Sequence, residues 1–179
     1  SHFFYLPDNK KGWIKQGFQK AEEIIGKHSI QAIYATAPPY SNLMLAAKLK
    51  TRLNIPTIMD FRDDWLESHL ISYPTPIHKI LMRRLEASVL AVADKVIAIN
   101  EPIASAISRR YPSLPSVVVQ THGYDSDDFD AAFFPSSSIK KKPTNENGFS
   151  KNEIIRILYS GTFYADSGPG IFLRAVKKL

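Results

Sequence analysis

Apolar residues recur along this chain in two alternating patterns. Positions three or four residues apart predict helices with one buried face, whereas short apolar runs predict strands covered by helices on both faces. The predicted helices span about residues 14–25, 45–53 and 76–93 and resume at residue 101, and the predicted strands span 30–36, 55–61, 95–99 and 116–121. This alternation is typical of stacked βα units. We therefore expect the α/β class, with a Rossmann-like parallel sheet flanked by helices.

Two details of the pattern predict local features of the helices. Along residues 76–93, the apolar stripe expected to face the core consists of Ile77, Leu81, Leu85, Val89 and Val92. Asn100 precedes Glu101-Pro102, and its side chain can accept a free backbone N–H where proline loses no helical bond. Asn100 is therefore expected to cap the fourth helix.

The composition changes between about residues 130 and 152. This stretch contains Ser136–Ser138, Lys140–Lys142 and Pro143 and has no apolar periodicity, as expected for a linker. We expect three parts: an N-terminal Rossmann-like lobe over residues 1–130, a linker over 131–152, and a first βα unit of a second lobe over 153–179. In that unit a strand is predicted at 154–160 and a helix from about Gly170.

The amino-acid composition excludes only a few classes of function. The 179 residues are 44% hydrophobic and carry a net charge of +6, so the chain can bury a domain-sized core and attract anions. The absence of cysteine excludes disulfides, thiolate zinc sites and a cysteine nucleophile. No signal peptide or membrane-spanning run is recognisable. We expect a cytoplasmic protein, with peripheral contact to the inner face of the membrane left open, and a chain truncated upstream of Ser1.

Ligands of open α/β sheets bind at the carboxyl ends of the strands, so the turns that follow the strands are the candidate sites. The first such turn carries Thr36, Pro38, Pro39 and Tyr40, and its rigid double proline would project the tyrosine at the edge of the sheet. The alternative is a stiff turn in which Ser41 caps the next helix.

The second turn concentrates charge. It carries Asp60, Arg62, Asp63 and Trp65; an arginine here can bind a phosphate or a sugar hydroxyl, and an indole can stack on a sugar ring. The alternative is an ion pair between Arg62 and Asp63 or Asp60, with Trp65 as part of the core.

The third turn contains Gly161, Thr162 and Tyr164 before Gly168-Pro169-Gly170. Glycines let the backbone approach a ligand closely, and a helix N-terminus favours a diphosphate. The spacing matches neither a P-loop nor the dinucleotide-binding fingerprint.

Other candidate sites are set aside. We expect Asp125–Asp128 to form a capped turn before Phe129 rather than a metal site, and the five histidines show no ligand spacing, so no metal is expected. Lys140–Lys142 lack interleaved aromatic residues, so no nucleic-acid partner is expected. Glu86 is expected to be an exposed charge with an intrahelical partner.

Taken in order, six short motifs resemble the retaining "group 1" glycosyltransferases of the GT-B fold, closest to bacterial members that build cell-surface polysaccharides. The motifs are 35–39 (ATAPP), 55–65 (IPTIMDFRDDW), 84–86 (RLE), 93–97 (ADKVI), 122–125 (HGYD) and 158–164 (LYSGTFY). Such proteins have two facing Rossmann-like lobes, of which the first receives the acceptor and the second holds the nucleotide-sugar. The chain would then be an incomplete N-terminal lobe of a GT-B fold with the start of the C-terminal lobe.

The resemblance implies roles for the candidate residues. Arg62 and Asp63 would be catalytic, near the donor sugar, and Gly161, Thr162 and Tyr164 would meet the donor diphosphate. The acceptor cleft would be lined by Thr36, Pro38, Pro39, Tyr40, Asp60 and Trp65. Catalysis would need no metal and no cofactor beyond the nucleotide-sugar co-substrate, with basic side chains and backbone N–H groups stabilising the departing nucleoside diphosphate.

The implied activity is transfer of a sugar from a nucleotide-sugar to a glycan or lipid-linked acceptor, and we expect the 179 residues alone to be inactive. Alternatives are a sugar-nucleotide epimerase of the same architecture and a non-catalytic nucleotide-binding α/β domain. Two departures from the family pattern stand out. Many relatives carry Arg or Lys after the glycine turn, where this chain has Ala165-Asp166, and His122 replaces a common Asn.

Overall fold

The computed structural model describes residues 6–68, 73–114, 116–129, 158–159 and 168–178. Contacts within the chain define two units, Ser1–Tyr124 and Asp125–Leu179. The predicted linker over 131–152 lies outside the described residues.

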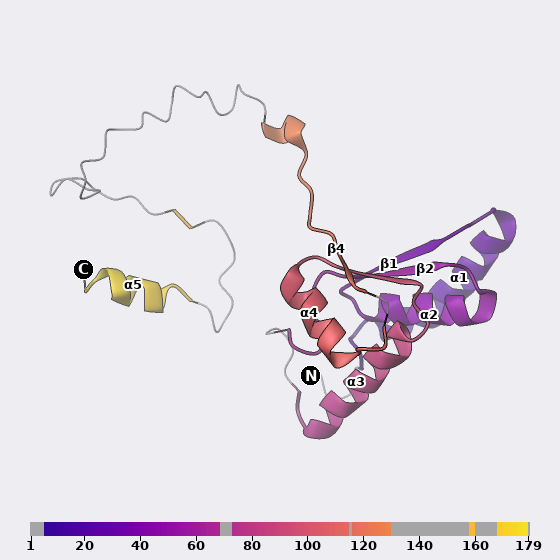
Figure 1. Cartoon of the computed structure of the whole chain (residues 1–179), viewed down its shortest axis with the longest axis horizontal. Helices are drawn as coiled ribbons and strands as arrows, with labels where there is room; N and C mark the ends of the chain where they lie inside the picture. The colour runs from indigo at the N-terminus through magenta and orange to yellow at the C-terminus, as the bar shows by residue number, and fades with distance from the viewer. Residues whose placement is uncertain (1–5, 69–72, 115, 130–157, 160–167, 179) are drawn as a thin grey trace. The chain divides into compact units, whose positions relative to one another are not determined.

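The first unit is built on a sheet of four parallel strands in the order β1-β2-β3-β4 (Figure 1). The strands are β1 (Ile33–Ala37), β2 (Thr57–Phe61), β3 (Lys95–Ala98) and β4 (Val118–Val119). In the register, Ala37 lies beside Phe61, Phe61 beside Ala98, and Ala98 beside Val119. All four strands therefore end at the same edge of the sheet, and the predicted α/β class with a Rossmann-like parallel sheet is confirmed.

A helix precedes β1, and one helix follows each of the first three strands. A short 3-10 turn, η1 (Lys11–Trp13), leads into α1 (Ile14–Lys27); the others are α2 (Ser41–Leu53), α3 (Pro76–Leu90) and α4 (Glu101–Arg110). Asn100 caps α4 as predicted, because its side-chain oxygen accepts the Ile103 N–H at 3.0 Å. The first turn of α2 is held differently from the expected Ser41 cap: the Ser41 N–H donates to the Asp8 carboxylate at 2.8 Å.

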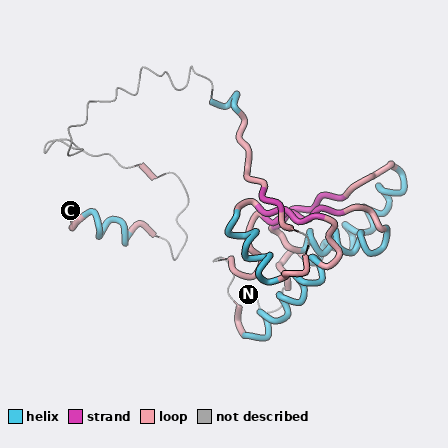
Figure 2. The backbone as a smooth tube through the Cα atoms, in the orientation of Figure 1, coloured by secondary structure: helices cyan, strands magenta, loops and turns pink. Residues whose placement is uncertain are grey.

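Helices α2, α3 and α4 lie on one side of the sheet (Figure 2). The core on that side consists of Ala35, Ala37, Met59, Phe61 and Val96 from the strands, packed against Leu43, Ala46, Met82, Val89, Leu90 and Ile107 from the helices. The opposite face is not covered to the same degree within the described residues, since Tyr34 and Val118 are 59% and 45% exposed. The described residues alone therefore do not meet the expectation of strands covered on both faces.

Helix α3 buries only the second half of the predicted stripe, where Val89 lies in the core and Leu85 packs against it. Ile77 and Leu81, expected in the core, are 65% and 40% exposed, whereas Met82 and Glu86 are buried. The stripe assigned from apolar periodicity excluded Glu86 because of its charge. The structure accommodates that charge beside a buried arginine, so the helix turns the Met82–Glu86 side towards the core.

The second unit is described only in short segments. η2 (Ser126–Phe129) is a 3-10 turn, and the Asp127 N–H donates to the Asp125 carboxylate at 3.0 Å, which confirms the predicted capped turn. α5 (Gly170–Val176) begins where the last helix was expected. Of the predicted strand at 154–160, only Leu158 and Tyr159 are described.

Candidate functional site at the carboxyl edge of the sheet

Backbone hydrogen bonds align the turns that follow the strands. The Arg62 N–H donates to the Ala37 carbonyl at 3.0 Å, the Ile99 N–H to Phe61 at 3.1 Å, and the Gln120 N–H to Ala98 at 2.9 Å. The proline turn after β1 and the arginine-aspartate turn after β2 are thus neighbours at one edge, as predicted. The third candidate turn, with Gly161, Thr162 and Tyr164, lies outside the described residues.

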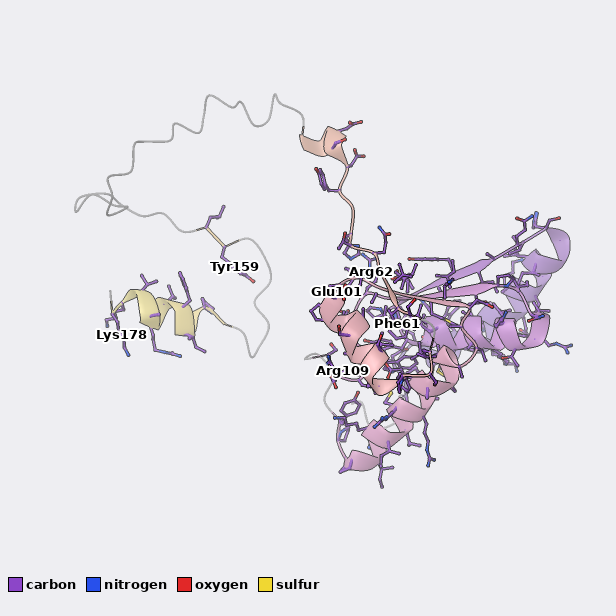
Figure 3. All side chains as sticks on the ribbon, in the orientation of Figure 1. Phe61, Arg62, Glu101, Arg109, Tyr159 and Lys178 are labelled. Atoms are coloured by element: carbon purple, nitrogen blue, oxygen red, sulfur yellow. The ribbon has the colours of Figure 1, made fainter. Side chains whose placement is uncertain are left out.

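Arg62 is exposed directly after Phe61, the last residue of β2 (Figure 3). Its guanidinium contacts the imidazole of His122, with Arg62 Nη2 lying 2.7 Å from Nε2 and 3.0 Å from Nδ1. It pairs with neither Asp60 nor Asp63, so the ion pair considered as the alternative does not form. In the sequence, His122 stands out only as a departure from the family pattern. Its position shortly after β4 could have indicated that it lies near Arg62, since β4 and β2 end at the same edge of the sheet.

The two aspartates flanking Arg62 occupy different environments. Asp60 is 8% exposed, and its carboxylate accepts a hydrogen bond from the Tyr34 hydroxyl at 2.6 Å. That hydrogen bond, together with partial burial, raises the pKa of Tyr34 above its ordinary value. Asp63 is half-buried, and its carboxylate has no hydrogen-bond or ion-pair partner in the described part of the chain. Asp63 is therefore the acidic group of this turn that remains available to a ligand.

Tyr40 and Trp65, assigned to an acceptor cleft, are core residues instead. Trp65 is fully buried and Tyr40 is 5% exposed, and their rings stack with centroids 4.7 Å apart and planes 15° apart. The Tyr40 hydroxyl donates to the Asp64 carbonyl at 3.0 Å. Burial raises the pKa of Tyr40 well above its ordinary value, with Asp63 and Asp64 adding to the effect. Both rings are occupied by each other, so neither can stack on a sugar in this conformation.

The remaining residues of the proline turn lie at or near the surface. Pro38 is exposed, whereas Pro39 and Thr36 are half-buried. The Thr36 carbonyl accepts a hydrogen bond from the Asn42 side chain at 3.2 Å, which ties the turn to α2. Pro38 and Pro39 directly follow Ala37, whose carbonyl accepts the Arg62 N–H, so this turn begins beside Arg62.

A buried charge network holds the arginine-aspartate turn in place. Arg110, the last residue of α4, donates to the Asp64 carboxylate at 2.9 Å and to the Glu86 carboxylate at 3.0 Å. The other Asp64 oxygen accepts the Leu66 and Glu67 N–H groups at 2.8 and 2.7 Å. The loop after β2 is thereby fixed to both α3 and α4.

Glu86 is the buried centre of this network, and the expectation of an exposed charge is wrong. Its side chain is fully buried and also accepts the Tyr111 hydroxyl at 2.8 Å. Burial raises the pKa of Glu86, although Arg110 and Tyr111 oppose the rise. For Arg110, burial alone would lower the pKa, but the two carboxylates outweigh it and raise the value. The network therefore combines one guanidinium with two carboxylates in a largely buried setting.

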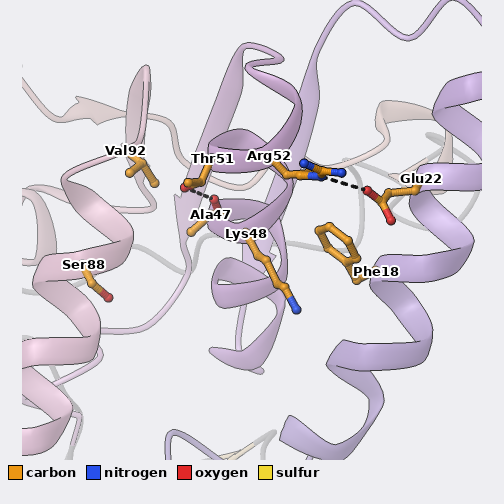
Figure 4. A pocket seen from close by; sticks show the side chains of 8 residues that line it. All are labelled: Phe18, Glu22, Ala47, Lys48, Thr51, Arg52, Ser88 and Val92. Atoms are coloured by element: carbon orange, nitrogen blue, oxygen red, sulfur yellow. Dashed lines mark hydrogen bonds and ion pairs between the residues drawn. The ribbon is translucent and has the colours of Figure 1, made fainter.

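A groove of about 730 Å³ lies away from this edge, between α1, α2 and α3 (Figure 4). Lys48 lies over the Phe18 ring, 4.6 Å from its centroid, and Arg52 lies 3.8 Å from the Glu22 carboxylate. The cations of the groove are thus engaged with neighbours from α1. None of the candidate site residues lines it.

The described residues contain no group of three or more metal-ligating side chains. None of the helices described is long and apolar enough to cross a bilayer. The fold and the edge together define the class: an α/β protein with a Rossmann-like parallel sheet and a charged carboxyl edge. No protein-family model matches the chain, and a search of curated proteins finds no match either.

Proposed function

We propose that the chain forms the acceptor-side wall of a glycosyltransferase, which transfers a sugar from a nucleotide-sugar to a glycan or lipid-linked acceptor. The observation that carries the proposal is that some charged side chains near the carboxyl edge have partners inside the fold, whereas others face outward. Asp60, Asp64 and Glu86 are committed to partners inside the fold, while Arg62 and Asp63 remain at the surface. A cation and a carboxylate held side by side on a rigid turn suit recognition of a phosphorylated sugar.

The proposed chemistry breaks the bond between the anomeric carbon and the diphosphate oxygen and forms one to the acceptor oxygen. The nucleoside diphosphate leaves with the electron pair, and its departing oxygen takes the proton that the acceptor hydroxyl loses. Arg62 would donate N–H groups to the developing negative charge or to a sugar hydroxyl, and Asp63 would accept a hydrogen bond from the reacting sugar. His122, from the segment that follows β4, would orient the Arg62 guanidinium. Gly161, Thr162 and Tyr164 are proposed to contact the diphosphate.

The test uses the protein expressed from its complete coding sequence, mixed with radiolabelled nucleotide-sugars and bacterial lipid and glycan acceptors. Arg62→Ala should lower kcat/KM about 10- to 100-fold, because a hydrogen bond to a charged group contributes about 1.5–3 kcal/mol. Asp63→Asn, which keeps size but removes charge, should reduce turnover as well. Arg109→Ala is the matched control, since Arg109 is also exposed but lies in the last turn of α4.

The products distinguish the alternatives. Label transferred to an acceptor supports the proposal, provided that Arg62→Ala is impaired and Arg109→Ala is not. A donor sugar that changes configuration without transfer would identify an epimerase. Binding of nucleotide without either change would identify a non-catalytic domain, and equal activity of all three variants would remove Arg62 and Asp63 from the site.

A further inference from the structure

The first half of α3 exposes apolar side chains that no other described part of the first unit buries. Ile77, Ile80 and Leu81 are 65%, 53% and 40% exposed. They lie three and four residues apart and so occupy one side of the helix. In Figure 1 the N-terminal end of α3 is the part of the helical layer that lies farthest from the sheet. Clustered apolar side chains at such a position indicate an interaction surface.

Unpaired cations accompany this apolar cluster. Lys79, Arg83 and Arg84 are exposed on the same helix, and none forms an ion pair with a described residue. The one acidic residue of α3, Glu86, is buried and neutralised by Arg110. The exposed charge of the helix is therefore purely positive, next to the apolar side chains. We refer to these six residues as the α3 surface.

We propose that the α3 surface docks the protein on a membrane containing anionic lipids. Apolar side chains flanked by Lys and Arg on one helix are the pattern by which amphipathic helices lie in the headgroup region of a bilayer. The positive charges match the negative surface potential of such a membrane. The docking would not depend on the proposed activity.

The experiment measures partitioning of the whole 179-residue chain onto vesicles by co-sedimentation. Vesicles of phosphatidylcholine with about 30% phosphatidylglycerol should bind the chain, and binding should weaken with salt. Replacing Lys79, Arg83 and Arg84 together by Gln should lower the partition coefficient roughly 100-fold, since each cation near an anionic surface is worth about a factor of five. Replacing Ile77, Ile80 and Leu81 by Ser should lower it at least about tenfold.

Matched controls distinguish an effect of the α3 surface from an effect of net charge or of exposed apolar side chains in general. Lys15, Lys95 and Arg109, replaced together by Gln, remove the same number of exposed charges elsewhere on the first unit, and Ile24→Ser with Ile30→Ser removes exposed apolar side chains from another site. Both controls should bind almost as the native chain does. In a separate variant, Ile80→Trp should show a blue-shifted emission on adding anionic vesicles if the residue enters the bilayer.

Three results would overturn the proposal. They are a native chain that does not sediment with anionic vesicles, equal losses in the α3 variants and their controls, and an Ile80→Trp emission that vesicles leave unchanged. Far-UV circular dichroism identifies a variant that has lost its fold. The Ile80→Trp measurement then stands alone, because it retains every charge of the α3 surface.

Discussion

Removing the Arg110 side chain charge tests whether the buried network determines the stability of the first unit. Arg110→Met keeps much of the aliphatic stem but leaves the fully buried Glu86 carboxylate and the nearly buried Asp64 carboxylate without a counter-ion. Breaking a buried ion pair from one side costs about 3–5 kcal/mol. That loss is a large fraction of the roughly 5–15 kcal/mol that stabilises a typical domain. We expect a clear decrease in the free energy of unfolding at neutral pH.

The pH dependence of this loss separates electrostatics from packing. The pKa of Glu86 in the folded protein is raised above its ordinary value of 4.5, so the folded state binds this proton more tightly than the unfolded state does. Stability from this group therefore falls as pH rises from about 4.5 through the folded-state pKa. The Arg110 charge lowers the pKa of Glu86, so without it the pH range over which stability falls extends to higher pH. The deficit of Arg110→Met should thus be largest at neutral pH and shrink towards pH 5.

The assay is urea unfolding at pH 7.5 and pH 5, followed by far-UV circular dichroism and by fluorescence, since Trp65 is fully buried and directly follows Asp64 in the sequence. Glu86→Gln provides the matched background because it keeps the side-chain size while removing the charge. In that background the loss caused by Arg110→Met should be smaller by about 1–3 kcal/mol. Equal losses in both backgrounds, or a deficit that does not change between the two pH values, would refute the reasoning.

Two further substitutions test the fold. Asn100→Ala should lower the free energy of unfolding by about 1 kcal/mol because it removes the cap of α4, and urea unfolding measures it; Asn100→Asp, which keeps the accepting oxygen, should restore most of the loss. Trp65→Ala should cost about 3–5 kcal/mol by leaving a cavity beside Tyr40, whereas a change below 1 kcal/mol would mean that the Tyr40–Trp65 stack is not part of the core.

The fold was largely predictable from the sequence because its signals are local. Apolar runs placed the strands within a few residues, and the Asn100 cap was recognisable from the residue types alone. The burial of Glu86 on α3 was not predictable in this way. It depends on Arg110, which lies 24 residues further along the chain, and periodicity carries no information about such a partner.

The candidate site was predictable in position but not in the roles of its residues. Parallel topology alone places the turns after β1 and β2 at one edge, so Thr36, Pro38, Arg62 and Asp63 could be grouped from the sequence. Whether an aromatic ring faces a ligand or the core depends on contacts between distant segments. Tyr40 and Trp65 lie 25 positions apart and satisfy each other by stacking, which residue type alone cannot reveal.

Whether a side chain has a partner inside the fold determines whether its substitution can report on function. Asp63 and Asp64 are adjacent and chemically identical, yet Asp64 binds Arg110 and two backbone N–H groups while Asp63 has no such partner among the described residues. Replacing Asp64 would release the loop that carries Arg62, so a loss of activity would reflect disordered geometry as readily as lost chemistry. Replacing Asp63 leaves those contacts in place. The pair therefore separates the two causes: an Asp63→Asn protein that unfolds normally but turns over slowly places the carboxylate in contact with the substrate.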